Sequence, residues 1–214
     1  MIKDSAKTIL CYGDSNTWGN VPRSDDRYPR SVRWPGALQK ILGEEYEVIS
    51  EGLCGRTLTA LDPRKLHRTG YNDVQAIVES ADPLDILIIM LGTNDVKTTY
   101  NLDANEIAQD LEEFIALIRN PKLELAKPPE ILIVCPPAVI VPSDGKLGER
   151  MINGPEIFKE LPALFEEVAA KYHVHFLDAE KHVTSSKIDG YHLDSESHLK
   201  LAEVIGNKIK EIGI

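Results

Sequence analysis

Five short runs of apolar residues, each followed by a stretch with helical periodicity, constrain the fold of this chain most strongly. The runs are hydrophobic at nearly every position rather than at alternate ones, which is typical of parallel strands buried on both faces. Strands that alternate with helices predict an α/β fold, here a three-layer α/β/α sandwich around a five-stranded parallel sheet with right-handed crossovers. The runs cover Thr8–Tyr12, Tyr46–Ser50, Asp85–Met90, Ile131–Cys135 and Val174–Leu177.

The segments between these runs place apolar residues on one side of a helix. One such face carries Ile107, Leu111, Phe114, Ile115 and Ile118. The 214 residues hold no internal repeat or low-complexity tract, so we expect a single domain over residues 1–214. Helices are expected over Trp34–Leu42, which ends at Gly43, and over Tyr71–Ser80, Asn105–Ile118, Pro155–Tyr172 and Ser195–Ile212.

The formal net charge of −10 argues against nucleic acid and against anionic membrane surfaces as partners. It leaves a weak preference for neutral or cationic substrates as an alternative reading. The N-terminal sequence has no apolar signal core, and the longest apolar stretch, Ile86–Leu91, is too short to cross a bilayer. We therefore expect a cytoplasmic protein. Three cysteines, no CxxC pair and no HExxH motif predict no disulfide framework, no metal and no cofactor.

Three segments that follow the first three runs carry groups suited to catalysis, at the edge where open parallel sheets bind ligands. Ser15 lies within GDSNTWG, where a tight strand-to-helix turn would expose its hydroxyl beside unpaired backbone N–H groups. Gly55, after the second run, would let its backbone N–H approach a ligand closely. The Asn94 amide, after the third run, could donate a hydrogen bond to a developing oxyanion. Each segment taken alone fits a plain turn or a helix cap better.

Asp189 and His192 lie three residues apart, just before the last predicted helix. A carboxylate at this spacing can accept a hydrogen bond from Nδ1–H and leave Nε2 free as a base. The alternative is a solvated pair of loop residues. The other histidines lack this arrangement and are expected to be structural or surface residues: His67, His173, His175, His182 and His198.

Taken together, the four segments supply a nucleophile, two hydrogen-bond donors and an Asp–His base, which is the minimum set for acyl transfer. Trp18 is a candidate wall of the substrate pocket, with packing against the first helix as the alternative. Cys54 is a candidate pocket residue and is expected to be a small buried side chain rather than a second nucleophile. Asp14 and Asp95 are expected to brace the loops.

These four segments resemble the sequence blocks of the GDSL, or SGNH, hydrolases: GDSNTWG, CGRT, GTND and DGYH, in that order. The resemblance implies a flavodoxin-like sandwich and a triad of Ser15, Asp189 and His192. It also implies an oxyanion hole formed by the N–H groups of Ser15 and Gly55 and by the Asn94 amide.

Two departures from the family pattern concern the substrate site. The family usually has leucine in the first block where this chain has Asn16, which makes Asn16 a candidate for altering polarity around the acyl site. The second block often has Asn-x-Gly, where this chain reads Glu-Gly-Leu.

The stretches RWPGAL, EGLCGRT and NDVK resemble the arylesterase and acyltransferase branch of that family. We therefore expect a serine hydrolase that cleaves short-chain or aryl esters of small molecules through an acyl-enzyme, with acyl transfer to alcohols as a second activity. The alternatives are a carbohydrate O-acetylesterase or a thioesterase with the same triad, and a non-enzymatic flavodoxin-like binding or phosphate-receiver module. The loop at residues 136–154 is a candidate for a substrate wall and for a contact in a homo-oligomer.

Overall fold

The five apolar runs form one parallel sheet in the computed structural model, which describes residues 2–213. The strand order is β2-β1-β3-β4-β5, the order of flavodoxin-like folds. The α/β prediction and its five parallel strands are therefore confirmed. The strands are β1 (Lys7–Gly13), β2 (Tyr46–Gly52), β3 (Ile86–Met90), β4 (Glu130–Cys135) and β5 (His175–Asp178).

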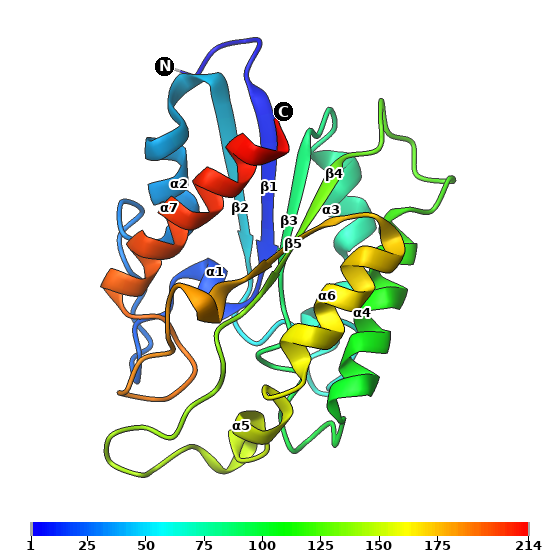
Figure 1. Cartoon of the computed structure of the whole chain (residues 1–214). Coiled ribbons are helices and arrows are strands. Elements are labelled where there is room, and N and C mark those ends of the chain that lie inside the picture. The colour runs from blue at the N-terminus through cyan, green and yellow to red at the C-terminus, as the bar shows by residue number, and fades with distance from the viewer. Residues whose placement is uncertain (1, 214) are drawn as a thin grey trace.

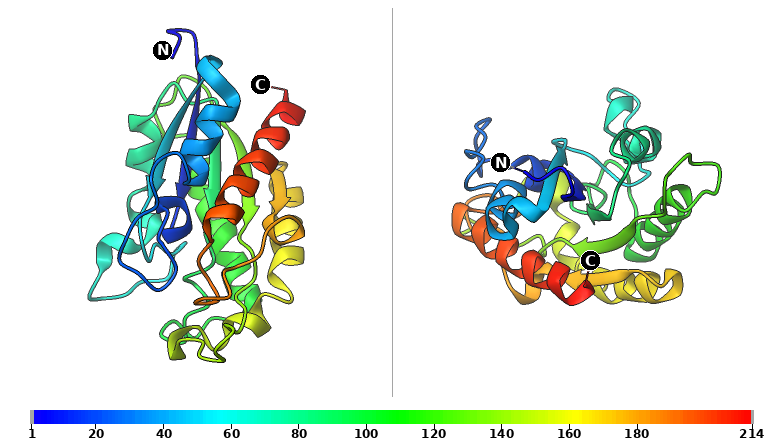
Figure 2. Two further views of the ribbon diagram at one scale, coloured as in Figure 1. Left: turned by 90° about the vertical axis from the view of Figure 1, so that its left-hand side faces the viewer. Right: turned by 90° about the horizontal axis from the view of Figure 1, so that it is seen from above.

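Two layers of helices cover the two faces of the sheet (Figures 1 and 2). Because successive strand residues point to opposite faces, Ile9 and Cys11 pack with α2 and α7, whereas Leu10 and Tyr12 pack with α3, α4 and α6. Both faces are thus buried, which explains why the strands read as continuous apolar runs. The helices are α2 (Trp34–Leu42), α3 (Val74–Ser80), α4 (Ala104–Ile118), α6 (Leu161–Tyr172) and α7 (Ser195–Ile212).

Local sequence accounts for several helix boundaries. Asp103 and Glu106 form a reciprocal capping box at the start of α4, and Asp194 caps α7 through Ser197 N–H. Gly43 ends α2, as predicted. Five further turns are short 3₁₀ helices: Gly43–Glu45, Leu66–Arg68, Gly70–Asn72, Glu149–Met151 and Ala179–Lys181.

Two predicted helices differ from the structure. The single helix expected over Pro155–Tyr172 is two helices, α5 (Gly154–Ile157) and α6. Pro162 lies in the first turn of α6, where it needs no N–H partner; inside one continuous helix it would remove a hydrogen bond and clash with the preceding turn. The prediction over Tyr71–Ser80 started too early, because α3 begins at Val74 after a 3₁₀ turn.

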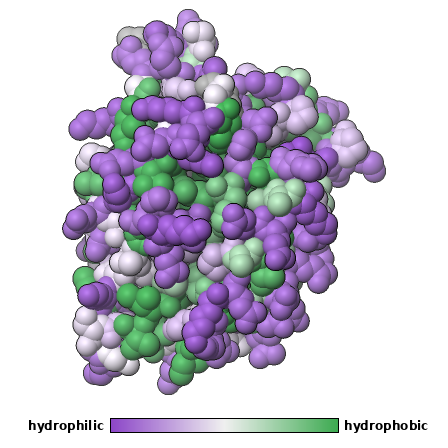
Figure 3. Space-filling view, in the orientation of Figure 1, coloured by the Kyte–Doolittle hydropathy of each residue, from purple (hydrophilic) through white to green (hydrophobic). Residues whose placement is uncertain are grey.

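The carboxyl ends of all five strands point to the end of the molecule that lies opposite the two termini (Figure 1). The short helix α1 (Ser15–Trp18), helix α5 and the loop at residues 136–154 lie at this end. Hydrophilic side chains predominate on the face in Figure 3, with hydrophobic ones in small groups between them. No helix within residues 2–213 combines the length and the apolar character needed to cross a bilayer.

Candidate active site

The three segments that follow β1, β2 and β3 lie side by side. In the sheet register, Gly13 at the end of β1 pairs with Gly52 on one side and with Met90 on the other. Ser15, Gly55 and Asn94 follow these three strand ends within four residues, and all three line one cavity. The sheet topology thus brings together groups that are far apart in the sequence.

Ser15 is the first residue of α1, a helix of four residues that begins directly after β1. The Asp14 carboxylate caps this helix by accepting a hydrogen bond from Asn16 N at 2.8 Å. Asp14 is 1% exposed, and burial raises the pKa of its carboxyl, against the lowering effects of the Asn16 N–H and of nearby His192, Lys97 and Arg56. Ser15 itself is 7% exposed at the floor of the cavity.

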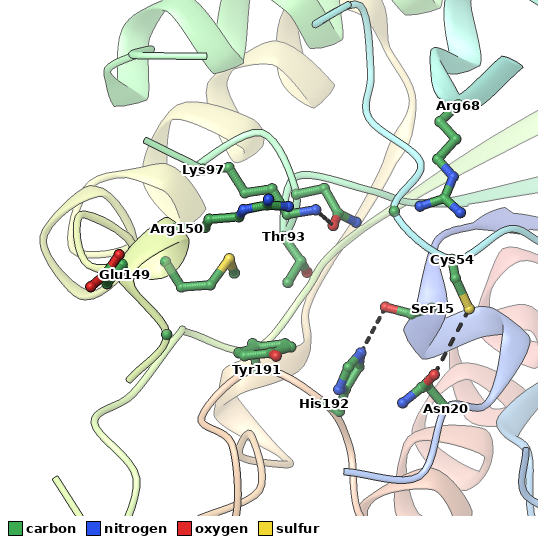
Figure 4. A pocket seen from close by; sticks show the side chains of 14 residues that line it. Ser15, Asn20, Cys54, Arg68, Thr93, Lys97, Glu149, Arg150, Tyr191 and His192 are labelled. Carbon is green, nitrogen blue, oxygen red and sulfur yellow. Dashed lines mark hydrogen bonds between the residues drawn. The ribbon is translucent and has the colours of Figure 1, made fainter. Parts of the chain in front are cut away.

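A continuous hydrogen-bonded chain joins Ser15, His192 and Asp189. The distance from His192 Nε2 to Ser15 Oγ is 3.0 Å, and that from His192 Nδ1 to Asp189 Oδ2 is 2.7 Å (Figure 4). This is the geometry of a base that can accept the serine proton while a carboxylate holds its ring.

Asp189 is built to remain ionised. Its carboxylate is 3% exposed, and burial alone would raise its pKa. The hydrogen bond and charge of His192, with backbone N–H bonds from His192 and Tyr191, outweigh burial and hold the pKa of Asp189 below its usual value. Arg23 N, at 3.1 Å from Oδ2, adds a further donor that the sequence patterns did not indicate. Since any residue but proline carries a backbone N–H, no side-chain signal marks this position.

The loop that carries Asp189 and His192 is held by the loop at residues 136–154. Ile140 N donates to Gly190 O at 2.8 Å, and Ser143 N donates to Lys187 O at 2.9 Å. Gly190 has a φ of 89°, and a Cβ on it would lie 2.1 Å from Ile140 O. Only glycine therefore fits at position 190, between Asp189 and His192.

Two backbone N–H groups at the cavity are free to bind an anion. Within residues 2–213, neither Ser15 N–H nor Gly55 N–H donates to another protein group. Gly55 adopts a φ of 82°, with the Arg68 guanidinium packed against the position where a Cβ would stand. Both N–H groups are therefore available as donors for the predicted oxyanion hole.

The Asn94 amide is less free than the sequence suggested. Its Nδ2 donates both to Asp14 Oδ2 at 3.1 Å and to Arg56 O at 3.0 Å, which engages both amide hydrogens. Its Oδ1 accepts from Lys97 Nζ at 2.6 Å. To hold an oxyanion, this amide has to share or release the hydrogen bond to one of these acceptors.

Of the three residues expected to line the substrate pocket, only Cys54 does so. Asn16 is 1% exposed and is not among the lining residues; its amide is bonded to the backbone on either side of His192. Trp18 lies outside the lining residues and stacks under the Arg27 guanidinium, 4.7 Å from the ring centroid. Asn16 and Trp18 do not line this cavity with Ser15 because a helical turn directs successive side chains to different sides.

The cavity has a volume of about 510 Å³ and is open on one side to solvent. This lies within the range of about 300–1,000 Å³ that is usual for small-molecule sites. Its walls come from the segments that follow all five strands, including residues 148–151 of the 136–154 loop, the candidate substrate wall. Figure 4 shows Tyr191, His192 and Ser15 on one side of the space and Lys97 and Arg150 on another.

Two buried charged residues support the site: Arg56, which the sequence patterns did not indicate, and Asp95, which was expected to brace a loop. Arg56 is 3% exposed, donates to Gly13 O at 3.1 Å and to Glu51 O, and stacks on the Tyr12 ring at 4.1 Å. It thereby ties the ends of β1 and β2 together. Asp95 is fully buried and accepts from Leu58 N at 2.9 Å; burial raises its pKa to about 7.

The remaining histidines lie outside the cavity. His198 is completely buried in α7 with its ring edge-on to Tyr28, and burial lowers its pKa to about 4. Within residues 2–213, no group of three or more His, Cys, Asp or Glu side chains is arranged to hold a metal ion.

Comparison with known proteins places this geometry among esterases. Along 226 residues the chain is 29% identical to an acetylxylan esterase from Xylanibacter ruminicola, covering 97% of the chain and 44% of that protein. The chain thus spans less than half of that relative's length.

Two solved structures match this chain over almost the full length of both chains. A carbohydrate acetylesterase from Sinorhizobium meliloti superposes with a TM-score of 0.88 at 33% identity, over 96% of this chain and 99% of the other. The M. smegmatis aryl esterase gives 0.87 at 29% identity, over 96% and 99%. Residues 11–200, which include Ser15, Asp189 and His192, match the GDSL-like Lipase/Acylhydrolase family. The chain therefore belongs to the GDSL-like Lipase/Acylhydrolase family.

Proposed function

We propose that the chain, a carboxylic ester hydrolase by its family, cleaves short-chain or aryl esters through an acyl-enzyme on Ser15. Ser15 Oγ attacks the ester carbonyl carbon, and its proton passes to His192 Nε2, 3.0 Å away. The carbonyl electron pair moves onto oxygen, where the N–H groups of Ser15 and Gly55 stabilise the negative charge. Asp189 holds the ring and stabilises its charged form.

The intermediate collapses when the carbonyl re-forms and the bond to the alcohol oxygen breaks. His192 gives its proton to that oxygen, and the alcohol leaves. Water then attacks the acyl-Ser15 carbonyl and yields its proton to His192, and the second collapse returns that proton to Ser15 Oγ. The net products are one alcohol and one carboxylic acid, and the enzyme is regenerated.

The single observation that carries this proposal is the chain Asp189–His192–Ser15, with links of 2.7 and 3.0 Å, opening onto the cavity. The test is Ser15→Ala, assayed with p-nitrophenyl acetate and with a fluorophosphonate probe that labels activated serines. We expect turnover to fall by at least about 1,000-fold and labelling to disappear. Turnover near that of the unmodified protein would exclude Ser15 as the nucleophile.

A carbohydrate O-acetylesterase is the second candidate, because an acetylxylan esterase and a carbohydrate acetylesterase are among the similar proteins. No observation favours a thioesterase. Comparing kcat/KM on acetylated xylose oligomers, aryl acetates and acetyl-CoA separates the three. The receiver alternative fails on Asp14, which is buried as a helix cap rather than exposed for phosphorylation.

Acyl transfer to alcohols is a further part of the proposal. Transfer in water requires a site that favours an alcohol over water at the acyl-enzyme, and residues 148–151 form one wall of the cavity in which that competition takes place. Adding ethanol to the p-nitrophenyl acetate assay measures the ratio of ethyl acetate to acetate. Formation of acetate alone would reject transfer.

A further inference from the structure

The cavity carries a charge opposite to that of the chain. Its lining includes three cationic side chains, Arg68, Lys97 and Arg150, and one carboxylate at its surface, Glu149. The whole chain has a formal net charge of −10. Because an acidic protein repels anions at long range, a local excess of cations at the site calls for a specific explanation.

In the described part of the chain, none of the three cations forms a direct ion pair. Within residues 2–213, none of them lies within salt-bridge distance of a carboxylate. Lys97 Nζ instead donates to the neutral Asn94 Oδ1. Among the described residues, no carboxylate in direct contact therefore neutralises the positive charges that line the cavity.

The charge of Lys97 is only partly compensated. Burial has the largest effect and lowers the pKa of its ammonium; the charges of Asp14 and Asp95 raise that pKa, and the charges of Arg150 and Arg68 lower it again. Both of these aspartates are buried beneath the cavity, and burial raises the pKa of each, which weakens their compensation. An anion bound beside Lys97 would relieve this repulsion.

Backbone contacts hold two of the cations together. Thr98 N donates to Arg150 O at 2.9 Å, which joins the segment after β3 to the 3₁₀ turn of the 136–154 loop. Met151, 4% exposed, anchors that turn in the hydrophobic core. Figure 4 shows the Lys97 and Arg150 side chains side by side across the cavity from Ser15 and His192, with Arg68 beyond Cys54. An anion held there would belong to the molecule whose ester lies at Ser15.

We propose that this cavity selects esters that carry a carboxylate on the same molecule, held by Lys97 and Arg150 with Arg68 as a third cation. The carboxylate belongs either to the acyl group, as in half-esters of dicarboxylic acids, or to the alcohol, as in acylated hydroxy acids. This inference rests on the proposed esterase function and adds the substrate class. It departs from the neutral or cationic substrates that the chain's acidity would favour.

The test compares kcat/KM for two pairs of substrates in which a carboxamide replaces the carboxylate. Monoethyl succinate and ethyl succinamate probe the acyl side, and acetoxyacetate and acetoxyacetamide probe the alcohol side. We expect a charged-to-neutral ratio of at least about ten in one pair, since a desolvated ion pair is worth about a factor of ten or more. The pair that shows it identifies where the carboxylate lies.

Variants then assign the ratio to the cations. Arg150→Gln and Lys97→Gln are each expected to lower it about tenfold. Lys146→Gln removes the same charge from the same loop, outside the cavity lining, and is expected to leave the ratio unchanged. Raising the ionic strength from about 0.01 M to about 1 M shortens the screening length from about 30 Å to about 3 Å, and should lower the ratio.

The outcomes separate this inference from the function on which it rests. Ratios of one or less in both pairs, with hydrolysis still dependent on Ser15, would overturn the substrate class and leave the esterase intact. A high ratio that survives both Arg150→Gln and Lys97→Gln would also overturn it. Hydrolysis that persists in Ser15→Ala would instead overturn the esterase mechanism.

Discussion

Replacing Asn16 by alanine is expected to disable the base without unfolding the protein. The Asn16 side chain spans His192: Nδ2 donates to Tyr191 O at 3.0 Å, and Oδ1 accepts from Leu193 N at 2.9 Å. Asn16 is 1% exposed, so these groups lose their partner without direct access to water. The same residue follows Ser15 directly, and it therefore links the nucleophile segment to the backbone on both sides of the base.

The size of the effect follows from these contacts. Two buried backbone groups left without partners cost about 1–3 kcal/mol each, or about 2–6 kcal/mol of unfolding free energy in total. A typical domain has about 5–15 kcal/mol, so Asn16→Ala is expected to fold with a lowered Tm. In the unmodified protein, His192 Nε2 lies 3.0 Å from Ser15 Oγ. A displacement of the base by about 1 Å costs about 100-fold in rate. We expect kcat to fall by that factor, with little change in KM.

The measurements are p-nitrophenyl acetate turnover, fluorophosphonate labelling rate and Tm. Leu111→Ala is the control, because Leu111 is 1% exposed in α4, away from the cavity, and its truncation costs about 2–5 kcal/mol. It should lower Tm and spare kcat. Equal loss of kcat in both variants would show that reduced stability, not a displaced base, explains the effect. Unchanged turnover in Asn16→Ala would refute the role of the two Asn16 hydrogen bonds in positioning His192.

Three further substitutions test other parts of the structure. Gly190→Ala places a Cβ 2.1 Å from Ile140 O at a φ of 89°; we expect a drop in Tm and in kcat together, and normal values for both would contradict the strained loop. Asp189→Asn should lower kcat by about three to four orders of magnitude while KM stays similar, measured with p-nitrophenyl acetate. For His198, the folded pKa of about 4 lies below the ordinary 6.5, so the unfolded chain binds the proton more tightly and stability falls as the pH drops from about 6.5 to about 4. His198→Phe should remove roughly 3 kcal/mol of that acid-side loss in urea titrations, and an unchanged pH profile would reject the assignment.

The layer architecture could be predicted because burial acts on each residue locally. A strand covered on both faces must be apolar at every position, and a helix covered on one side must be apolar every third or fourth residue. These two rules located all five strands and four of the five expected helices, although α3 begins later than expected. They failed at Pro162, where apolar spacing continued across a break that the missing N–H imposes.

The sequence by itself determined the fold class and the identity of the groups at Ser15, Gly55, Asn94 and the Asp189–His192 pair, because strand ends in a parallel sheet meet at one edge. Only the tertiary structure decided how those groups are held. Three features depend on contacts between segments far apart in the chain: the Asn16 hydrogen bonds on either side of His192, the Arg23 N–H bond to Asp189, and the bond from the Asn94 amide to Arg56 O. The two cations Lys97 and Arg150 are likewise brought close together by one backbone hydrogen bond between two loops, from Thr98 N to Arg150 O. Loop conformations of this kind are set by long-range hydrogen bonds rather than by local propensity, so no pattern of neighbouring residues predicts them.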